Sequence, residues 1–258
     1  MNPELNTWIQ AFLRWAHVVA GVIWIGHLYF FNWVNGPFQG KIDGPTKRVV
    51  NPELMPRALY WFRWGAAWTW FTGILLGGLI YYHGRIVFED PNSGNPWLWL
   101  AIVVVVLAVG FVIYNFIMKA IKNVVVASEI CLILFAAVYE MLDWCGHFSG
   151  RSLYIHAGVI LGTMMALNVW MVIWPSQKKI IAAVKEGTPP DPNLVALAGL
   201  RSRQNTYMSV PLIFTMISNH YPTMFGGQYR DVCLAAVILL GFAVVRLLYG
   251  KAAKVPGM

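Results

Sequence analysis

The sequence predicts an all-α integral membrane protein: a single domain, residues 1–258, built from about seven transmembrane helices. Of its residues 58% are hydrophobic and only 12% are charged, and the mean hydropathy is +0.58. An average soluble domain is less apolar and carries about twice as many charged residues. Seven apolar stretches reach the length of about 17 to 25 residues that a helix needs to cross a hydrocarbon core. We therefore expect the chain to lie in lipid, in the bacterial inner (cytoplasmic) membrane.

In chain order, the apolar stretches predict helices over residues 11–33, 62–82, 97–118, 123–144, 152–174, 204–220 and 231–249. The sixth stretch is the least regular, because it contains the polar residues Asn205, Ser209 and Asn219 as well as Pro211. Membrane helices tolerate such breaks only where neighbouring protein or water satisfies the freed backbone groups. The longest connection, residues 175–203, is predicted to be a loop on the inner side.

Basic residues predict the orientation, since Lys and Arg collect at the cytoplasmic ends of membrane helices. Of the 19 Lys and Arg residues, 15 lie at the C-terminal end or around the segments that join helices one to two, three to four and five to six. The N-terminus is therefore expected outside and the C-terminus inside. Residues 1–7 hold no basic segment and no cleavage site, so we expect the first helix to be retained. This topology accounts for the formal charge of +8, and no nucleic-acid partner is expected.

The three cysteines, Cys131, Cys145 and Cys233, form neither a CxxC pair nor a CxxCH motif. Zinc sites commonly use the first pattern, and covalent attachment of a c-type haem uses the second. Neither a zinc site nor a covalent haem c is therefore expected, and we interpret the cysteines as buried thiols.

Five of the six histidines are predicted to lie at the outer side of the membrane. They are His17, His83, His147, His156 and His220. Ionisable side chains within apolar helices are costly and usually face a site that uses them. Histidines on facing helices can hold haem b, with neutral imidazole as the iron ligand. His17 and His156 are accordingly predicted to be the axial ligands of one non-covalent haem b, the alternative being two hydrogen-bonded core histidines.

Residues near these two histidines add to the prediction. Arg14 and Arg151, a few positions before them, are predicted to neutralise haem propionates. Gly21, one turn below His17, would leave room for a flat macrocycle. His220, at the end of the sixth helix, is predicted to be an alternate iron ligand, a ligand of a second metal or a substrate contact. Its alternative interpretation is a histidine at headgroup level.

Two carboxylates in the fourth predicted helix suggest a proton route. Glu129 and Glu140 are separated by eleven residues, which places them on one helix face about 16 Å apart. Intramembrane carboxylates at two depths are typical of proton relays. The alternative is that each carboxylate lies at one of the two membrane interfaces.

Several blocks of the sequence, in the same order, occur together in one known family. They are Trp24-Ile-Gly26 with Leu28-Tyr-Phe-Phe-Asn32, Arg63-Trp-Gly-Ala66 with Thr69 and Gly73, Gly162-Thr-Met-Met-Ala-Leu-Asn-Val-Trp170, Ile173-Trp-Pro-Ser-Gln177, Arg201-Ser-Arg-Gln-Asn205, Ser209-Val-Pro211 and Asn219-His220. Together they resemble the membrane domain of the membrane-bound urate oxidase (urate hydroxylase) family. The resemblance extends over about residues 8 to 250.

The resemblance implies a redox role. In urate-oxidising members of this family, the membrane domain is fused to a C-terminal cytochrome c and delivers substrate electrons to the respiratory chain. This sequence ends at Met258 without a CxxCH motif, so the partner is expected to be a separate c-type cytochrome or another respiratory subunit.

Three functions therefore fit the sequence. The chain is predicted to carry electrons through haem b, between an outer c-type cytochrome or substrate and a respiratory partner. The enzymatic alternative is an oxidoreductase that hydroxylates urate with a separate cytochrome c. The third is a structural subunit, free of cofactors, of a larger membrane complex.

Overall fold

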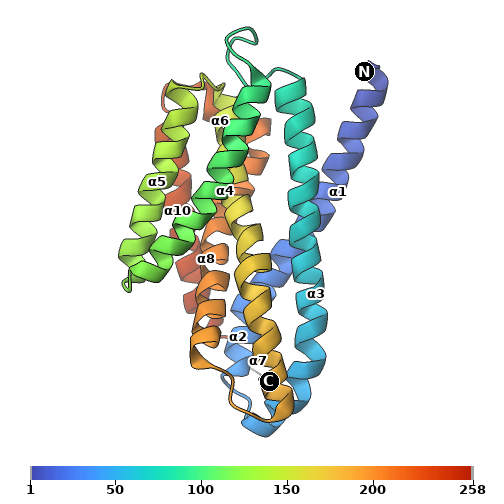
Figure 1. The fold of residues 1–258 in the computed structure, drawn as a ribbon, viewed down its shortest axis with the longest axis vertical. Coiled ribbons are helices and arrows are strands. Elements are labelled where there is room, and N and C mark those ends of the chain that lie inside the picture. Colours follow the sequence, from blue (N-terminus) through green and yellow to red (C-terminus); the bar gives the residue numbers. More distant parts are fainter. Residues whose placement is uncertain (1, 257–258) are drawn as a thin grey trace. The chain divides into compact units, whose positions relative to one another are not determined.

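The computed structural model describes residues 2–256, and this part of the chain is almost entirely helical, without a strand. The elements are α1 (Pro3–Tyr29), η1 (Phe30–Asn35), α2 (Gly36–Gln39), α3 (Gly44–Gly77), η2 (Gly78–His83), α4 (Pro96–Ala120), α5 (Val124–Trp144), α6 (Gly150–Leu167), η3 (Asn168–Ile173), α7 (Trp174–Glu186), α8 (Pro192–Ile217), η4 (Ser218–His220), α9 (Pro222–Gly226) and α10 (Arg230–Ala252) (Figure 1). The segments η1, η2 and η3 are π-helical, and η4 is a 3₁₀ turn.

Five helical stretches of the described chain are long and apolar enough to cross a membrane. They are Pro3–Gln39, Pro96–Ala120, Val124–Trp144, Gly150–Glu186 and Arg230–Ala252. The predicted all-helical fold is thereby confirmed, and these stretches are candidate membrane spans by their length and composition. The stretches predicted over 62–82 and 204–220 are helical as well, within α3 with η2 and α8 with η4, but they do not reach the same apolarity. The count of seven crossings and the orientation stay predictions.

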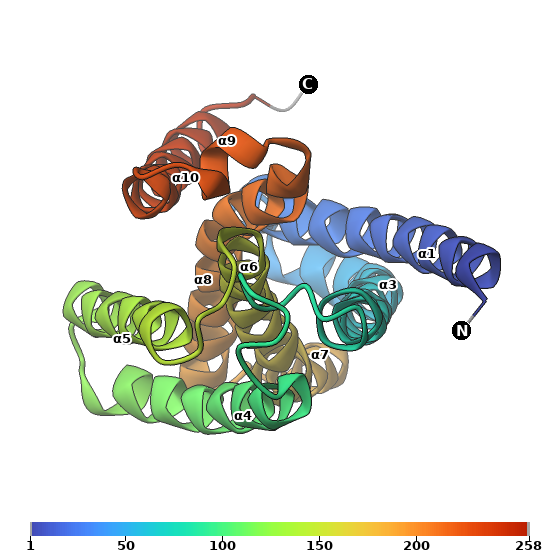
Figure 2. The ribbon, with the colours of Figure 1, turned by 90° about the horizontal axis from the view of Figure 1, so that it is seen from above.

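Asparagine side chains define the start of α4 and α5. Asn95 Oδ1 accepts hydrogen bonds from the backbone N–H groups of Trp97 and Leu98, and Asn123 Oδ1 accepts from that of Val125 at 3.0 Å. These bonds satisfy donors that have no partner inside the helix. Both helices belong to one compact unit, where they form a side-by-side pair joined by a short connection (Figures 1 and 2).

The loop predicted over residues 175–203 is wrong, because most of this segment is helical. Pro175 lies in the first turn of α7 and Pro192 is the first residue of α8. A proline fits a first turn, since the N–H group that it lacks has no partner there. Gly187 ends α7 with a φ of 77°, a left-handed conformation that glycine adopts without strain.

The expectation of a buried thiol is wrong for Cys145, which is exposed.

The chain divides into two compact units. Unit 1 comprises residues up to 73, 165–211 and from 237 on, and unit 2 comprises residues 74–164 and 212–236. In unit 1, α1 and the first part of α3 approach closely at Gly65, where a Cβ atom would lie 3.0 Å from the backbone nitrogen of Trp24. The core of unit 2 includes the fully buried Leu153 and Tyr154. One domain over residues 1–258 stays a prediction.

Candidate functional site

His156 on α6 is buried in unit 2, and both of its ring nitrogens are hydrogen bonded. Nδ1 lies 2.8 Å from the carbonyl oxygen of Ser152, and Nε2 lies 2.7 Å from the hydroxyl of Tyr82. Because a carbonyl oxygen only accepts, Nδ1 carries the proton and Nε2 accepts a hydrogen bond from Tyr82. Phe148 packs against the ring, with the two centroids 4.9 Å apart. The Nε2 lone pair is therefore engaged, and binding of iron through it would require Tyr82 to move away.

Arg151, at the start of α6, is held by a polar cluster of the same unit. Its Nε donates a hydrogen bond of 2.6 Å to Asn219 Oδ1, which also accepts one of 3.0 Å from the hydroxyl of Tyr81. His220 follows Asn219 and is exposed. The structure thus brings Arg151, His156 and the chain segment that holds His220 into one unit. The π-helical segment η2 supplies Tyr81 to this cluster and Tyr82 to His156.

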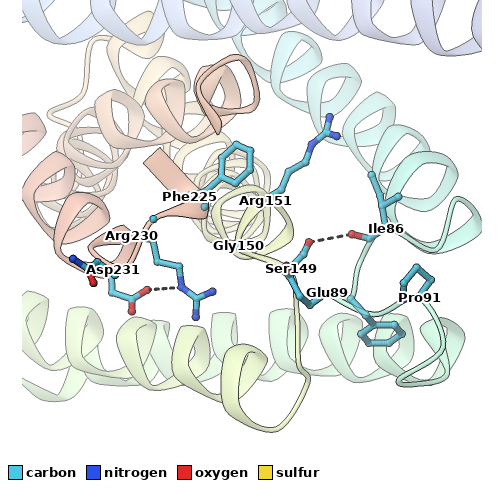
Figure 3. A pocket seen from close by; sticks show the side chains of 13 residues that line it. Ile86, Glu89, Pro91, Ser149, Gly150, Arg151, Phe225, Arg230 and Asp231 are labelled. Carbon is cyan, nitrogen blue, oxygen red and sulfur yellow. Dashed lines mark hydrogen bonds and ion pairs between the residues drawn. The ribbon is translucent and has the colours of Figure 1, made fainter. Parts of the chain in front are cut away.

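A cavity of about 680 Å³ lies next to this cluster in unit 2 (Figure 3). Its charged lining residues are two arginines, Arg151 and Arg230, and two carboxylates, Glu89 and Asp231. Arg230 forms ion pairs with Asp143 and, at 3.4 Å, with Asp231. Positive and negative charges balance in this lining, so the cavity has no net electrostatic preference for an anion or a cation.

His17 lies on α1 in unit 1, half-buried against α3. Its Nδ1 is 3.1 Å from the Thr72 hydroxyl, which donates its own hydrogen to the carbonyl of Trp68 at 2.6 Å. Nδ1 must then be the donor, and the lone pair of His17 lies on Nε2, an atom through which histidine binds metals. A Cβ atom on Gly73 would lie 3.1 Å from the ring, so this glycine makes room for the imidazole.

Arg14 and Gly21, which were predicted to lie beside the haem, are both on α1. Arg14 is exposed on α1, and a Cβ atom on Gly21 would meet Thr69 at 3.8 Å, so the space at Gly21 faces α3. Across residues 2–256, no three His, Cys, Asp or Glu side chains come together as a metal site would require. His17 and His156 belong to different units, and their shared haem stays a prediction. In this structure Nδ1 of His17 is hydrogen bonded to Thr72, whereas Nε2 of His156 is hydrogen bonded to Tyr82.

The two glutamates of the predicted proton route lie on α5. Both are exposed, and Glu140 accepts a hydrogen bond of 2.9 Å from the indole N–H of Trp144. Neither carboxylate lines one of the two cavities described. The proton route stays a prediction.

A second cavity, of about 520 Å³, lies entirely within unit 1. Its lining residues are Phe31, Asn32, Asn35, Gly36, Met55, Leu59, Phe62, Ile173, Gln177, Ala198, Gly199, Leu200, Ser202, Arg203 and Tyr249. The polar members come from η1, α7, α8 and α10. Segments of π-helix occur frequently at functional sites, and η1 presents three of these residues to the cavity.

Hydrogen bonds hold one wall of this cavity in place. Asn32 Nδ2 donates to Ser202 Oγ at 2.8 Å, and Asn32 Oδ1 accepts from the Tyr249 hydroxyl at 2.7 Å. These bonds tie η1 to α8 and α10. The apolar floor contains Leu59 and Phe62, which are 3% and 1% exposed. The cavity is thus a preformed pocket with an apolar floor and a polar rim, the usual character of a small-molecule site.

Sequence reasoning missed the groups that the structure brings together around these sites. Nothing in the sequence around Tyr82 marks it as the partner of a histidine 74 residues away. Gln177 and Arg203 belong to blocks that carry the family resemblance, and this was the one signal that pointed to them. Their convergence on one cavity depends on the packing of α7 and α8, which the sequence did not reveal.

Comparison with known proteins identifies the family. The model described as "Urate oxidase N-terminal" matches residues 38–255, a range that includes Gln177, Arg203 and His156 and begins after η1. His17 on α1 thus lies outside the matched range. No curated protein and no solved structure matches the chain significantly. The chain, a helical membrane protein by its fold, therefore belongs to the urate oxidase N-terminal family.

Proposed function

We propose that this chain is the membrane-embedded part of a urate oxidase-type redox system. It oxidises urate or a closely related planar nitrogen heterocycle, and a separate c-type cytochrome takes the electrons. The observation that carries the proposal is the family match over residues 38–255. Two preformed cavities, each with arginine in its lining, support small-molecule binding.

The proposed reaction balances with water as the source of oxygen. Urate and water give 5-hydroxyisourate, two protons and two electrons as the new C–O bond forms. Each c-type cytochrome accepts one electron, so two oxidised cytochromes are reduced for each urate consumed. Residues 1–258 hold no CxxCH motif, so the assay supplies an oxidised c-type cytochrome as the electron acceptor.

The test uses the full chain, purified in detergent or kept in membranes, with urate and oxidised cytochrome c. We expect loss of urate absorbance together with cytochrome reduction in the stated two-to-one ratio. Membranes prepared without the chain serve as the control. Urate left unchanged, both with cytochrome c and with the respiratory acceptors of a native membrane extract, would refute the proposal.

A haem b redox centre is the second proposal, and His17 is the observation that favours it. This histidine lies within the apolar helix α1 and is oriented by Thr72 so that its lone pair is on Nε2. When bound, a haem would supply one-electron transfer between the substrate and the cytochrome. His17 would hold the iron, and Arg14, which precedes it on the same helix, is the cation proposed for a propionate.

A pyridine haemochrome spectrum of the purified chain, expressed with a supply of haem, tests this second proposal. We expect His17→Ala to remove the haem signal while membrane insertion is kept. His27→Ala is the matched control, because His27 lies on the same helix and its Nδ1 contacts the Ile23 carbonyl oxygen at 2.7 Å. A parent protein without protohaem, or a His17→Ala variant with the full signal, would refute the assignment.

We further propose that the chain lies in the bacterial inner membrane with its C-terminus in the cytoplasm. The excess of basic residues near the C-terminus and the inner connections supports this orientation. A fluorescent reporter fused to the C-terminus should be active, whereas a periplasmic phosphatase fused there should not. The reverse pattern would refute the orientation.

A further inference from the structure

The unit 1 cavity carries a cation and no carboxylate. Arg203 lines it, and its guanidinium lies 4.7 Å from the centre of the Tyr249 ring. None of the lining residues is acidic, and no ion pair within residues 2–256 involves Arg203. Arginine keeps its charge at any physiological pH and presents several donors in one plane. The cavity therefore favours a ligand with a negative, planar edge.

Amide groups add both donors and acceptors to the same cavity. Gln177 on α7 makes no side-chain hydrogen bond to the rest of the described chain, so its N–H and C=O groups are available. Asn35 is 7% exposed, and its Nδ2 has only a long contact of 3.7 Å to the sulfur of Met55. A quinone ring offers acceptors alone. A ring that alternates C=O and N–H groups, as a purine dione or trione does, can use both halves of an amide.

The unit 1 cavity also has flat apolar surfaces that match the faces of a planar ring. Phe31 and Phe62 lie edge to face, with centroids 5.3 Å apart, and both line the cavity. Two glycines, Gly36 and Gly199, leave parts of the wall without side chains. Aromatic faces and bare backbone suit a flat ring better than a branched or flexible ligand.

We infer that this cavity is the binding site for the planar, anionic heterocycle, with Arg203 and Gln177 holding its polar edge. The inference rests on the proposed function and assigns the substrate to unit 1. Urate is a monoanion at neutral pH and carries the required alternation of C=O and N–H groups. The cavity of unit 2 is the weaker candidate for an anion, because Glu89 and Asp231 offset the charges of its two arginines.

The first experiment measures equilibrium binding of urate to the purified full chain by isothermal titration calorimetry. We expect Arg203→Gln to weaken urate binding about 30-fold, the effect of losing a charge-assisted hydrogen bond. Arg246→Gln is the matched control, since Arg246 is an exposed arginine of unit 1 that does not line the cavity. Xanthine, a similar ring that is neutral at slightly acidic pH, should lose far less affinity in Arg203→Gln.

The second experiment changes the cavity wall without removing a charge. Gly199 is an exposed lining residue at which a Cβ atom would meet no atom within 4 Å, so the position accepts a side chain, and Gly199→Leu adds a larger apolar group there. We expect this variant to fold and to lose urate binding at least 10-fold. Gly250→Leu is the control, because Gly250 is equally unobstructed and does not line the cavity.

The outcomes separate this inference from the proposed function. Loss of urate binding in both cavity variants, with both controls unchanged, supports the inference. Urate oxidation by the parent with unchanged binding in both variants overturns the inference and leaves the proposed function intact. A parent that neither binds nor oxidises urate overturns both. The inference is also overturned if Arg203→Gln weakens the binding of a short-chain quinone and leaves the binding of urate unchanged.

Discussion

Replacing Tyr82 by phenylalanine removes one oxygen atom from the core of unit 2 and leaves the ring in place. The hydroxyl lies 2.7 Å from His156 Nε2, and the two residues are each 3% exposed. In Tyr82→Phe the buried Nε2 loses the hydroxyl that is its partner in the described chain. An unsatisfied buried acceptor costs about 1–3 kcal/mol, and we expect Tyr82→Phe to lower the unfolding free energy by that amount.

A double-mutant cycle isolates the bond from other effects of the substitution. His156→Phe removes the acceptor, and the double variant replaces both partners by apolar rings, which is far less costly than leaving one of them alone. The coupling energy should fall within about 0.5–3 kcal/mol. Tyr60→Phe is the control, because Tyr60 is 48% exposed and such surface changes remain within about 0.5 kcal/mol.

Unfolding is followed by circular dichroism of the purified chain in mixed micelles, titrated with a denaturing detergent. A Tyr82→Phe variant as stable as the parent, with no coupling to His156, would refute the hydrogen bond and the tautomer deduced from it. The haem content of the same samples gives a second result. A rise in haem content in Tyr82→Phe would show that freeing Nε2 lets His156 bind iron, against the structural role argued above.

Two further changes test the packing and the charges of single units. Gly65→Ala should destabilise unit 1 by about 1–3 kcal/mol, since its Cβ atom would lie 3.0 Å from the Trp24 backbone nitrogen. Gly26→Ala is the control and should be neutral or slightly stabilising, because a Cβ atom there would meet no atom within 4 Å. Unfolding by detergent titration distinguishes the two variants. Asp143→Asn should lower the thermal midpoint, because its ion pair with Arg230 joins side chains only 19% and 27% exposed, and an unchanged midpoint would show that the pair contributes nothing.

The sequence was sufficient to predict the apolar helices but not the helices of the polar segment 175–203. Apolar length alone predicted stretches that the structure contains as α4, α5 and α10, because crossing lipid leaves the backbone few alternatives to a helix. The segment 175–203 was misjudged, since its polarity and prolines suggested a loop. In the structure Pro175 lies in the first turn of α7 and Pro192 is the first residue of α8, so residues that suggested a loop begin two helices.

The site was harder to predict for a physical reason. A histidine within an apolar helix is costly whether it binds a metal or a neighbouring side chain, so its position cannot distinguish the two uses. For His156 the difference is made by Tyr82, which is distant in sequence and is placed by the π-helical turn of η2. The family blocks contained Gln177 and Arg203, but only the fold shows that they share a cavity.

The buried polar groups of unit 1 explain why its cavity is the place to look for a ligand. Polar side chains in an apolar bundle are retained when they join helices or serve a site. Asn205 joins α8 to the end of α6, since its Nδ2 donates to the Met165 carbonyl at 2.9 Å, and it accepts a bond of 2.9 Å from Asn168. Those groups are used within the fold. Gln177 is half-buried and makes no side-chain hydrogen bond, and Arg203 is an exposed guanidinium that packs on the Tyr249 ring and forms no ion pair, so a planar anion at this cavity could bind to both.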